Sequence, residues 1–124
     1  MFTTIMTQQN QTYKRGDIVL VLFPHSNLKT AKVRPALVVQ ADDLQTGLPQ
    51  LIVAMVTSRM FRANHPCRVP VHLLSSEGKQ SGLLTDSLVM TDNLATVAEP
   101  EIDRIIGSLP MDNIDIALRH TLGL

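Results

Sequence analysis

The chain has 124 residues, of which 44% are hydrophobic, and its 11 basic and 11 acidic residues leave no formal net charge. This length and composition predict one domain with its own core and exclude a chain of two domains. The single Cys67 excludes an internal disulfide, and one cysteine with four scattered histidines lacks the paired spacing of a zinc site, so we expect no metal and no cofactor.

The first twelve residues differ from the rest of the chain. They are rich in Thr and Gln, carry no charge, and lack the basic start and long apolar run of a signal peptide. No later run approaches the length of a membrane span. We expect residues 1–12 to form a flexible N-terminal segment, residues 13–124 to form the domain, and the protein to be cytoplasmic and not bound to a membrane.

Short apolar runs dominate the body of the chain. Residues 17–23 (DIVLVLF) are rich in β-branched side chains and end at Pro24, which predicts a strand buried on both faces. The same criteria predict strands at residues 36–40, 51–56, 69–74 and 87–90. Turn-forming clusters separate them at residues 24–27, 42–49, 64–66 and 75–82. Short strands with no helix between them predict an antiparallel sheet closed into a small barrel.

The C-terminal tail has a different pattern. From about residue 111 apolar residues recur at helical spacing, and Gly123 stands where a helix would end, which predicts one helix packed on the barrel. Residues 101–109 fit either a helical stripe or, from residue 104, a last strand. The predicted fold is therefore mainly β with a C-terminal helix. The residues that define the helical stripe are Ile114, Ala117, Leu118, Thr121 and Leu122.

The neutral total hides an uneven distribution of charge. Residues 1–72 contain eight basic and three acidic side chains, whereas residues 73–124 contain three basic and eight acidic ones. Such a chain could present a basic face to a polyanion. Ordinary surface charge explains the same counts equally well.

Arg34 and Thr57 stand out by their positions. Arg34 precedes the second predicted strand and Thr57 follows the third, at nearly equal distances from the turn around residues 44–45. In an antiparallel hairpin the start of one strand lies beside the end of the next, so the two should be neighbours. A guanidinium beside a hydroxyl suits a phosphate group. The alternative is that Arg34 pairs with a surface carboxylate and Thr57 merely ends a strand.

Four ordered blocks resemble the MazF/PemK-like toxin family and cover nearly everything after Tyr13. Residues 16–39 carry a Gly-Asp strand, a Phe-Pro loop and Arg-Pro-Ala-Leu-Val. The second and third blocks are LIVAMVTSR at residues 51–59 and GLLTDSLVMTDNLATV at residues 82–97. The ending resembles the family in IIGSL followed by IALRHTLGL.

The resemblance implies an SH3-like barrel, a last strand at residues 104–109, and a homodimer whose shared groove holds RNA. It implies a metal-independent endoribonuclease of a type II toxin–antitoxin system. In this family the ribose 2′-OH attacks the adjacent phosphate of single-stranded RNA, and a cognate antitoxin inhibits the toxin when its disordered segment folds across the groove.

Site residues follow from the matched motifs. The family's catalytic Arg and Thr fall on Arg34 and Thr57, and Asp92 matches an acidic position near the RNA groove. His25, in the loop after the first strand, is a candidate general base, although a loop histidine is also typical of plain surface. Residues 24–33 and Ala95 depart from the best-known members at the RNA-facing rim. The expected RNA-binding residues are Lys29, Lys32, Ser58, Arg59, Arg62 and Asp92.

Two other functions are compatible with this fold. Gyrase-directed relatives use a C-terminal helix that ends in an aromatic residue, which the tail RHTLGL lacks. A module that binds RNA or a partner without cutting is the other alternative. The sequence favours cleavage.

Overall fold

The computed structural model describes residues 13–24 and 31–124, so the expected flexible segment 1–12, the candidate base His25 and the predicted RNA contact Lys29 lie outside the described residues. The described chain forms six strands, two α-helices and two 3₁₀ turns. No helix in this part is long and apolar enough to cross a membrane. The strands are β1 (Asp17–Pro24), β2 (Ala31–Val38), β3 (Gln50–Thr57), β4 (Arg68–Val71), β5 (Ser87–Ala98) and β6 (Ile102–Ser108). The helices are α2 (Ser76–Ser81) and α3 (Asp112–Leu122), and the 3₁₀ turns are η1 (Met60–Arg62) and η2 (Glu99–Glu101).

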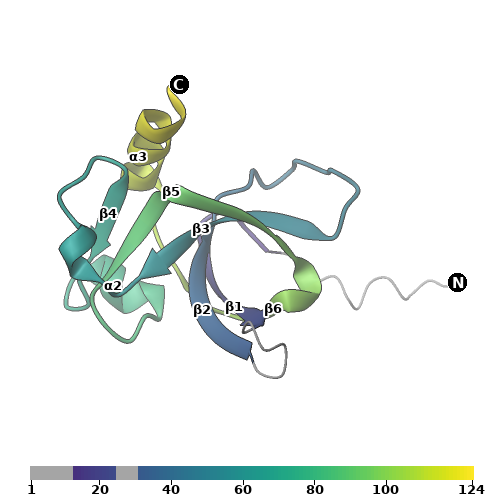
Figure 1. The fold of residues 1–124 in the computed structure, drawn as a ribbon, viewed down its shortest axis with the longest axis horizontal. Coiled ribbons are helices and arrows are strands. Elements are labelled where there is room, and N and C mark those ends of the chain that lie inside the picture. The colour runs from purple at the N-terminus through teal and green to yellow at the C-terminus, as the bar shows by residue number, and fades with distance from the viewer. Residues whose placement is uncertain (1–12, 25–30) are drawn as a thin grey trace, which may run out of the picture.

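All six strands belong to one antiparallel sheet in the order β4-β5-β3-β2-β1-β6. The sheet is strongly curved, and the long β5 bends across the molecule so that α3 stands beside its first half (Figure 1). The expected mainly β, barrel-like fold with a C-terminal helix is confirmed, but the predicted closure of the sheet is wrong for the described residues. Its ladder stays open between the edge strands β4 and β6, and α2 packs on β6 through a 2.9 Å bond from Gln80 Nε2 to Ser108 Oγ.

β1 is buried on both faces, as the apolar run at residues 17–23 predicted. Ile18 and Val19 are both 0% exposed and point to opposite sides of β1. Ile18 belongs to a cluster under α3, and Val19 to a cluster inside the curve of the sheet. The first cluster consists of Ile18, Leu37, Ala54, Val56, Val71, Leu83, Val89, Leu109, Ile114 and Leu118. The second consists of Val19, Val21, Ala36, Val38, Leu51, Val53, Val97 and Ile102.

The C-terminal helix forms where the apolar spacing placed it. Ile114, Ala117 and Leu118 are buried, and Gly123 ends the helix in the left-handed conformation with φ 71°. Arg15 fixes the helix to the start of β1, because its Nη2 lies 2.6 Å from Asp115 Oδ1 and its Nε donates to Val39 O. Residues 102–108 form the last strand, so the alternative of a helix there is wrong.

Several segments differ from the sequence prediction. β5 runs to Ala98, eight residues past its predicted end, because its second half pairs with β3, and β4 ends at Val71, three residues before its predicted end. β2 begins at Ala31, five residues early, so that Arg34 lies within it rather than before it. Residues 75–82, predicted as a turn, contain α2, whose Ser75 side chain accepts a hydrogen bond from the Gly78 N–H and which ends at Gly82. The segment is polar, and its helix depends on that cap and on its packing against β6.

β5 carries a three-residue bulge near its middle. Ala54 pairs with Leu94 but Met55 pairs with Met90, which leaves residues 91–93 outside the β3 ladder. Within the bulge Thr91 is buried, and its Oγ1 donates to Cys67 O at 2.6 Å. The next two residues, Asp92 and Asn93, are exposed, so the bulge presents a carboxylate and an amide at the surface.

We predict that Gly107→Ala destabilises the fold strongly. A Cβ there would lie 2.3 Å from the backbone C and O atoms of Ser81, so α2 would have to move away from β6. The free energy of unfolding should fall by about 3 kcal/mol. In Gly47→Ala the new Cβ meets nothing within 4 Å, and only the positive φ of 79° costs stability, about 1 kcal/mol. Urea denaturation of both variants checks this, and equal losses would contradict it.

Candidate active site

Arg34 and Thr57 are neighbours across the β2–β3 hairpin. The ladder pairs Val38 with Val53 and Ala36 with Met55, and the same register continued by two residues sets Arg34 opposite Thr57. Both side chains line the same two clefts. The structure therefore brings together the two residues that the symmetry of the hairpin predicted to meet.

The first cleft has a volume of about 640 Å³ and is strongly cationic. Three chain segments supply four cations, and none of its lining residues is acidic. Ser58, also a predicted RNA contact, lies on its wall. Such a cleft attracts a polyanion even though the whole chain is neutral. The cations are Lys32 and Arg34 from β2, Arg59 from the segment after β3, and Arg104 from β6.

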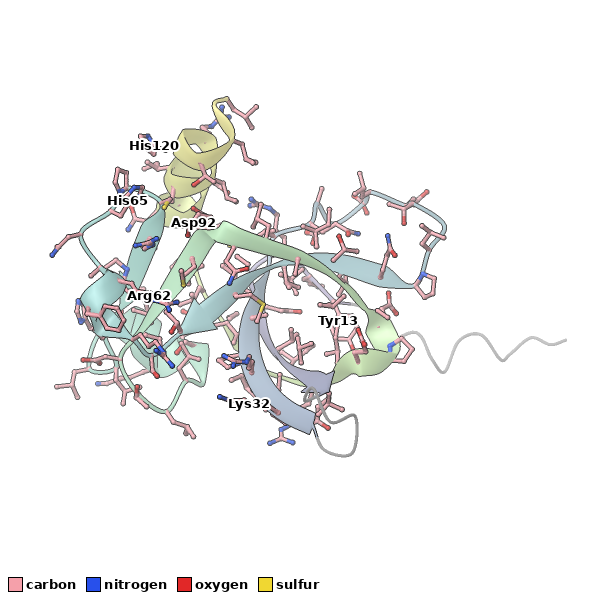
Figure 2. The ribbon with its side chains drawn as sticks, in the orientation of Figure 1. Tyr13, Lys32, Arg62, His65, Asp92 and His120 are labelled. Atoms are coloured by element: carbon pink, nitrogen blue, oxygen red, sulfur yellow. The ribbon has the colours of Figure 1, made fainter. Side chains whose placement is uncertain are left out.

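The second cleft, of about 510 Å³, lies across the end of β3 from the first. It shares Arg34, Thr57 and Arg59 with the first cleft, so the two meet at these residues. Arg62 and the bulge residue Asn93 line only the second cleft. Figure 2 shows Lys32 of β2, which lines the first cleft, and Arg62 of η1, which lines the second. The two clefts therefore adjoin at the Arg34–Thr57 pair.

The Thr57 hydroxyl is oriented by the backbone. Its Oγ1 accepts a 3.1 Å hydrogen bond from the Arg59 N–H, which leaves the hydroxyl proton to donate to another group. The Arg34 guanidinium is exposed, and no hydrogen bond or ion pair engages it within the described part of the chain. The pair thus offers several donors to an anion held at the junction of the clefts.

The ion pair of Arg68 with Asp92 holds η1 in place. Arg68 Nη2 donates to Asp92 Oδ2 at 3.0 Å, while Arg68 Nη1 donates to the carbonyl oxygen of Arg62 at 3.0 Å. The hydrogen bond from Arg68 holds the pKa of the Asp92 carboxyl below its usual range. Asp92 lines neither cleft and acts on η1 through Arg68. Its predicted contact with RNA stays a prediction.

Cys67 lies beside this pair and is buried. Its Sγ is 2.8 Å from His65 Nδ1, and Figure 2 shows His65 at the base of α3. Burial, and then the charge of Asp92, raise the pKa of the Cys67 thiol. The thiol therefore stays protonated at neutral pH and packs as part of the core.

Two residues on the cleft walls were missed by the sequence analysis. Arg104 enters the first cleft because β6 pairs with β1, setting Arg104 beside Leu20. Asn93 enters the second cleft because of the bulge. A polar pair in the middle of a strand, Asp92 and Asn93, was the available signal for a bulge. Ala95, a departure from the family pattern, also lines the second cleft.

Within residues 13–24 and 31–124, no three His, Cys, Asp or Glu side chains come close enough together to hold a metal ion.

The curved sheet and the two clefts that meet at an Arg–Thr pair define a small barrel-like protein with a cationic cleft. A family model described as PemK-like, MazF-like toxin of type II toxin–antitoxin system matches residues 14–122. The chain belongs to this family. It is 30% identical over 115 residues to Endoribonuclease EndoA of Bacillus subtilis (strain 168), covering 90% of this chain and 95% of that protein.

Solved structures share the fold. A mycobacterial endoribonuclease in complex with its cognate antitoxin superimposes with a TM-score of 0.69 at 21% identity, covering 90% of this chain and 96% of that one. A MazE–MazF structure from Deinococcus radiodurans gives a TM-score of 0.67 at 20% identity, covering 93% and 99%. These likenesses confirm the SH3-like barrel with its C-terminal helix.

We predict that Asp92→Asn lowers the free energy of unfolding by about 1 kcal/mol at pH 7, because it removes the charged acceptor of Arg68 in a partly exposed pair. The folded pKa of Asp92 lies below its unfolded value, so this stability is present above the unfolded pKa and is lost as pH falls through the folded one. Thermal unfolding of both proteins from pH 7 to pH 3 should show the difference fading with acid.

Asp103→Asn is the matched control. Asp103 pairs with its neighbour Arg104 at 2.6 Å, but both side chains are more exposed, so this substitution should change stability little. Equal destabilisation by the two substitutions would show that the Arg68–Asp92 pair has no special role.

Proposed function

We propose that this toxin is an endoribonuclease that cuts single-stranded RNA without a metal, with Arg34 and Thr57 as its catalytic residues. The observation that carries the proposal is the meeting of these two side chains at the junction of two cationic clefts. The 30% identity to an endoribonuclease of nearly equal length supports the same activity. The RNA chain follows the path of the clefts and places one phosphate on the Arg–Thr pair.

The reaction uses the substrate's own nucleophile. The ribose 2′-oxygen forms a bond to the adjacent phosphorus as it loses its proton, and the bond from phosphorus to the 5′-oxygen of the next nucleotide breaks. The leaving oxygen takes up a proton and becomes a 5′-OH end, while the other product ends in a 2′,3′-cyclic phosphate. The protein must stabilise the negative charge of the five-coordinate phosphorus.

Arg34 supplies that stabilisation. Its planar fork donates to two phosphate oxygens, and its place in β2 holds its backbone across the hairpin from Thr57. Arginine holds its proton too tightly to act as a ready acid, so its role is electrostatic. Lys32 in the same cleft adds positive charge around the phosphate, and Arg104 adds less because it pairs with Asp103.

Thr57 orients the phosphate. Since its oxygen already accepts from the Arg59 N–H, the remaining hydroxyl proton donates to a phosphate oxygen or the 2′-oxygen. His25, outside the described residues, remains our candidate for the base that takes the 2′-OH proton. Lys29, also outside them, remains a candidate RNA contact.

The family membership extends the proposal to partners. We propose that two copies of the chain form a homodimer, and that a cognate antitoxin inhibits the enzyme in the cytoplasm by covering the clefts. A mycobacterial relative was solved with its cognate antitoxin. The cationic clefts suit a segment that carries carboxylates in place of phosphates.

We predict that Arg34→Ala lowers the cleavage rate at least about a hundredfold, because one preorganised donor to the transition state is lost. Thr57→Val should lower it about tenfold to a thousandfold, whereas Thr57→Ser, which keeps the hydroxyl, should stay within about threefold of the wild type. Cleavage of a fluorescent RNA under single-turnover conditions measures all three. Unfolding curves and sedimentation confirm that each variant folds and assembles like the wild type. Full activity of Arg34→Ala would overturn the assignment.

We predict that the cations of the first cleft contact RNA phosphates. Replacing Lys32 and Arg59 together by Gln should weaken binding at every sequence and flatten the salt slope by about 1 to 1.5 units, at about 0.7 per phosphate on a single strand. The control replaces Lys79 on α2 and Arg119 on α3, which line neither cleft. Affinity for a deoxy-blocked oligonucleotide over a salt series is the measurement. A slope that falls equally in both double variants would place the RNA elsewhere.

A further inference from the structure

Phe61 is an exposed aromatic residue in a chain that has few of them. Aromatic residues make up 3% of the sequence, and the Phe61 side chain in η1 is 78% exposed. The residues on either side of it include Arg59 and Arg62, so an apolar ring stands on a strongly cationic rim. A partner that buries this ring must stack against an aromatic face and carry groups that attract cations.

The turn that carries Phe61 is well supported. The Arg62 N–H donates to Arg59 O at 3.1 Å, and the Ala63 N–H donates to Met60 O at 3.0 Å. Arg68, held by Asp92, binds the carbonyl oxygen of Arg62. These bonds fix the backbone on both sides of the ring, so Phe61 is presented from a defined position.

Arg62 lies over one face of the ring. Its guanidinium carbon is 5.6 Å from the ring centroid, and its Nη1 contacts Met90 Sδ at 3.9 Å. The cation–π contact orients the ring, yet most of its surface stays open to solvent. Arg62 lines the second cleft, whereas Phe61 lines neither cleft, so the guanidinium connects the exposed ring to the cleft.

The ring is close to the catalytic pair along the chain. Phe61 follows Thr57 by four residues, so their Cα atoms are at most about 14 Å apart. Arg59, between them, lines both clefts. A nucleotide chain with one phosphate at Arg34 and Thr57 can therefore extend to Phe61.

We propose that Phe61 is a stacking platform for one unpaired base of the RNA, flanking the scissile phosphate, while Arg62 and Arg59 bind the phosphates beside that base. This inference rests on the proposed endoribonuclease function and adds a base subsite to it. Proteins that bind single strands combine a cationic groove with aromatic rings that stack on bases. The cations around Phe61 favour an RNA base over an apolar protein segment as the occupant.

The test uses an RNA that the wild-type protein is first shown to cut. An oligonucleotide of the same sequence with a 2′-deoxy sugar at the scissile position cannot be cleaved and reports binding alone. Phe61→Ala should weaken its binding about fivefold to a hundredfold, the range for losing one stacked base. Phe61→Tyr keeps the ring and should bind within about twofold of the wild type. Leu74→Ala, which removes another exposed side chain (89%) outside both clefts, should have no effect.

An abasic scan separates stacking from other effects. At one position the loss of the base should weaken wild-type binding by the same factor as Phe61→Ala, and combining the two changes should add nothing further. The salt slope should not change in Phe61→Ala, because no charge is removed. Sedimentation of each variant reports its assembly.

Each outcome either supports the Phe61 subsite or overturns it. Coupling of Phe61→Ala to one base position, with Phe61→Tyr intact, supports the subsite. If the wild type cuts RNA but Phe61→Ala binds within twofold of it, or loses affinity equally for every abasic oligonucleotide, the subsite is overturned and the enzymatic function stands. A changed assembly in Phe61→Ala makes Phe61 a subunit contact and also overturns it. A wild type that neither binds nor cuts RNA overturns both proposals.

Discussion

The burial of β2 and β3 on both faces fixes the register on which the site depends. Leu37 and Ala54 belong to the cluster under α3, while Ala36 and Val53 belong to the cluster inside the curve of the sheet, and all four are fully buried. A slip of one residue would move every side chain of a strand to the opposite face and disrupt both clusters together. The position of Arg34 opposite Thr57 is thus maintained by core packing, without a direct bond between the two side chains.

The site gains its charge from segments that are far apart in the sequence. Arg34 and Lys32 come from β2, Arg59 follows β3, and Arg104 comes from the half of the chain that is mainly acidic. Pairing of β6 with β1 carries Arg104 to the other cations. Local potential at a cleft depends on which charges the fold brings together, so a net charge of zero is compatible with a strongly cationic site.

The sequence predicts what depends on local pattern and misses what depends on distant packing. The run at residues 17–23 was enough for β1, and the symmetry of one hairpin was enough for the Arg34–Thr57 pair. β5 extends eight residues past its predicted end because β3 pairs with its polar second half, a contact that no local signal encodes. The helix α2 and the place of Arg104 also depend on β6. The roles of Arg34 and Thr57 came from the family resemblance, since their residue types alone also suit plain surface.

The bulge in β5 separates residues that are held by the sheet from residues that face solvent. Residues on either side of it are locked into the ladder and the core, whereas Asp92 and Asn93 face outward and form no ladder pair with β3. Asn93 lines a cleft and Asp92 braces the turn that carries Phe61. Exchanges at position 93 can therefore reshape the rim without cost to the core. In the proposed enzyme, a substitution at position 93 would change the surface offered to RNA and leave the barrel intact.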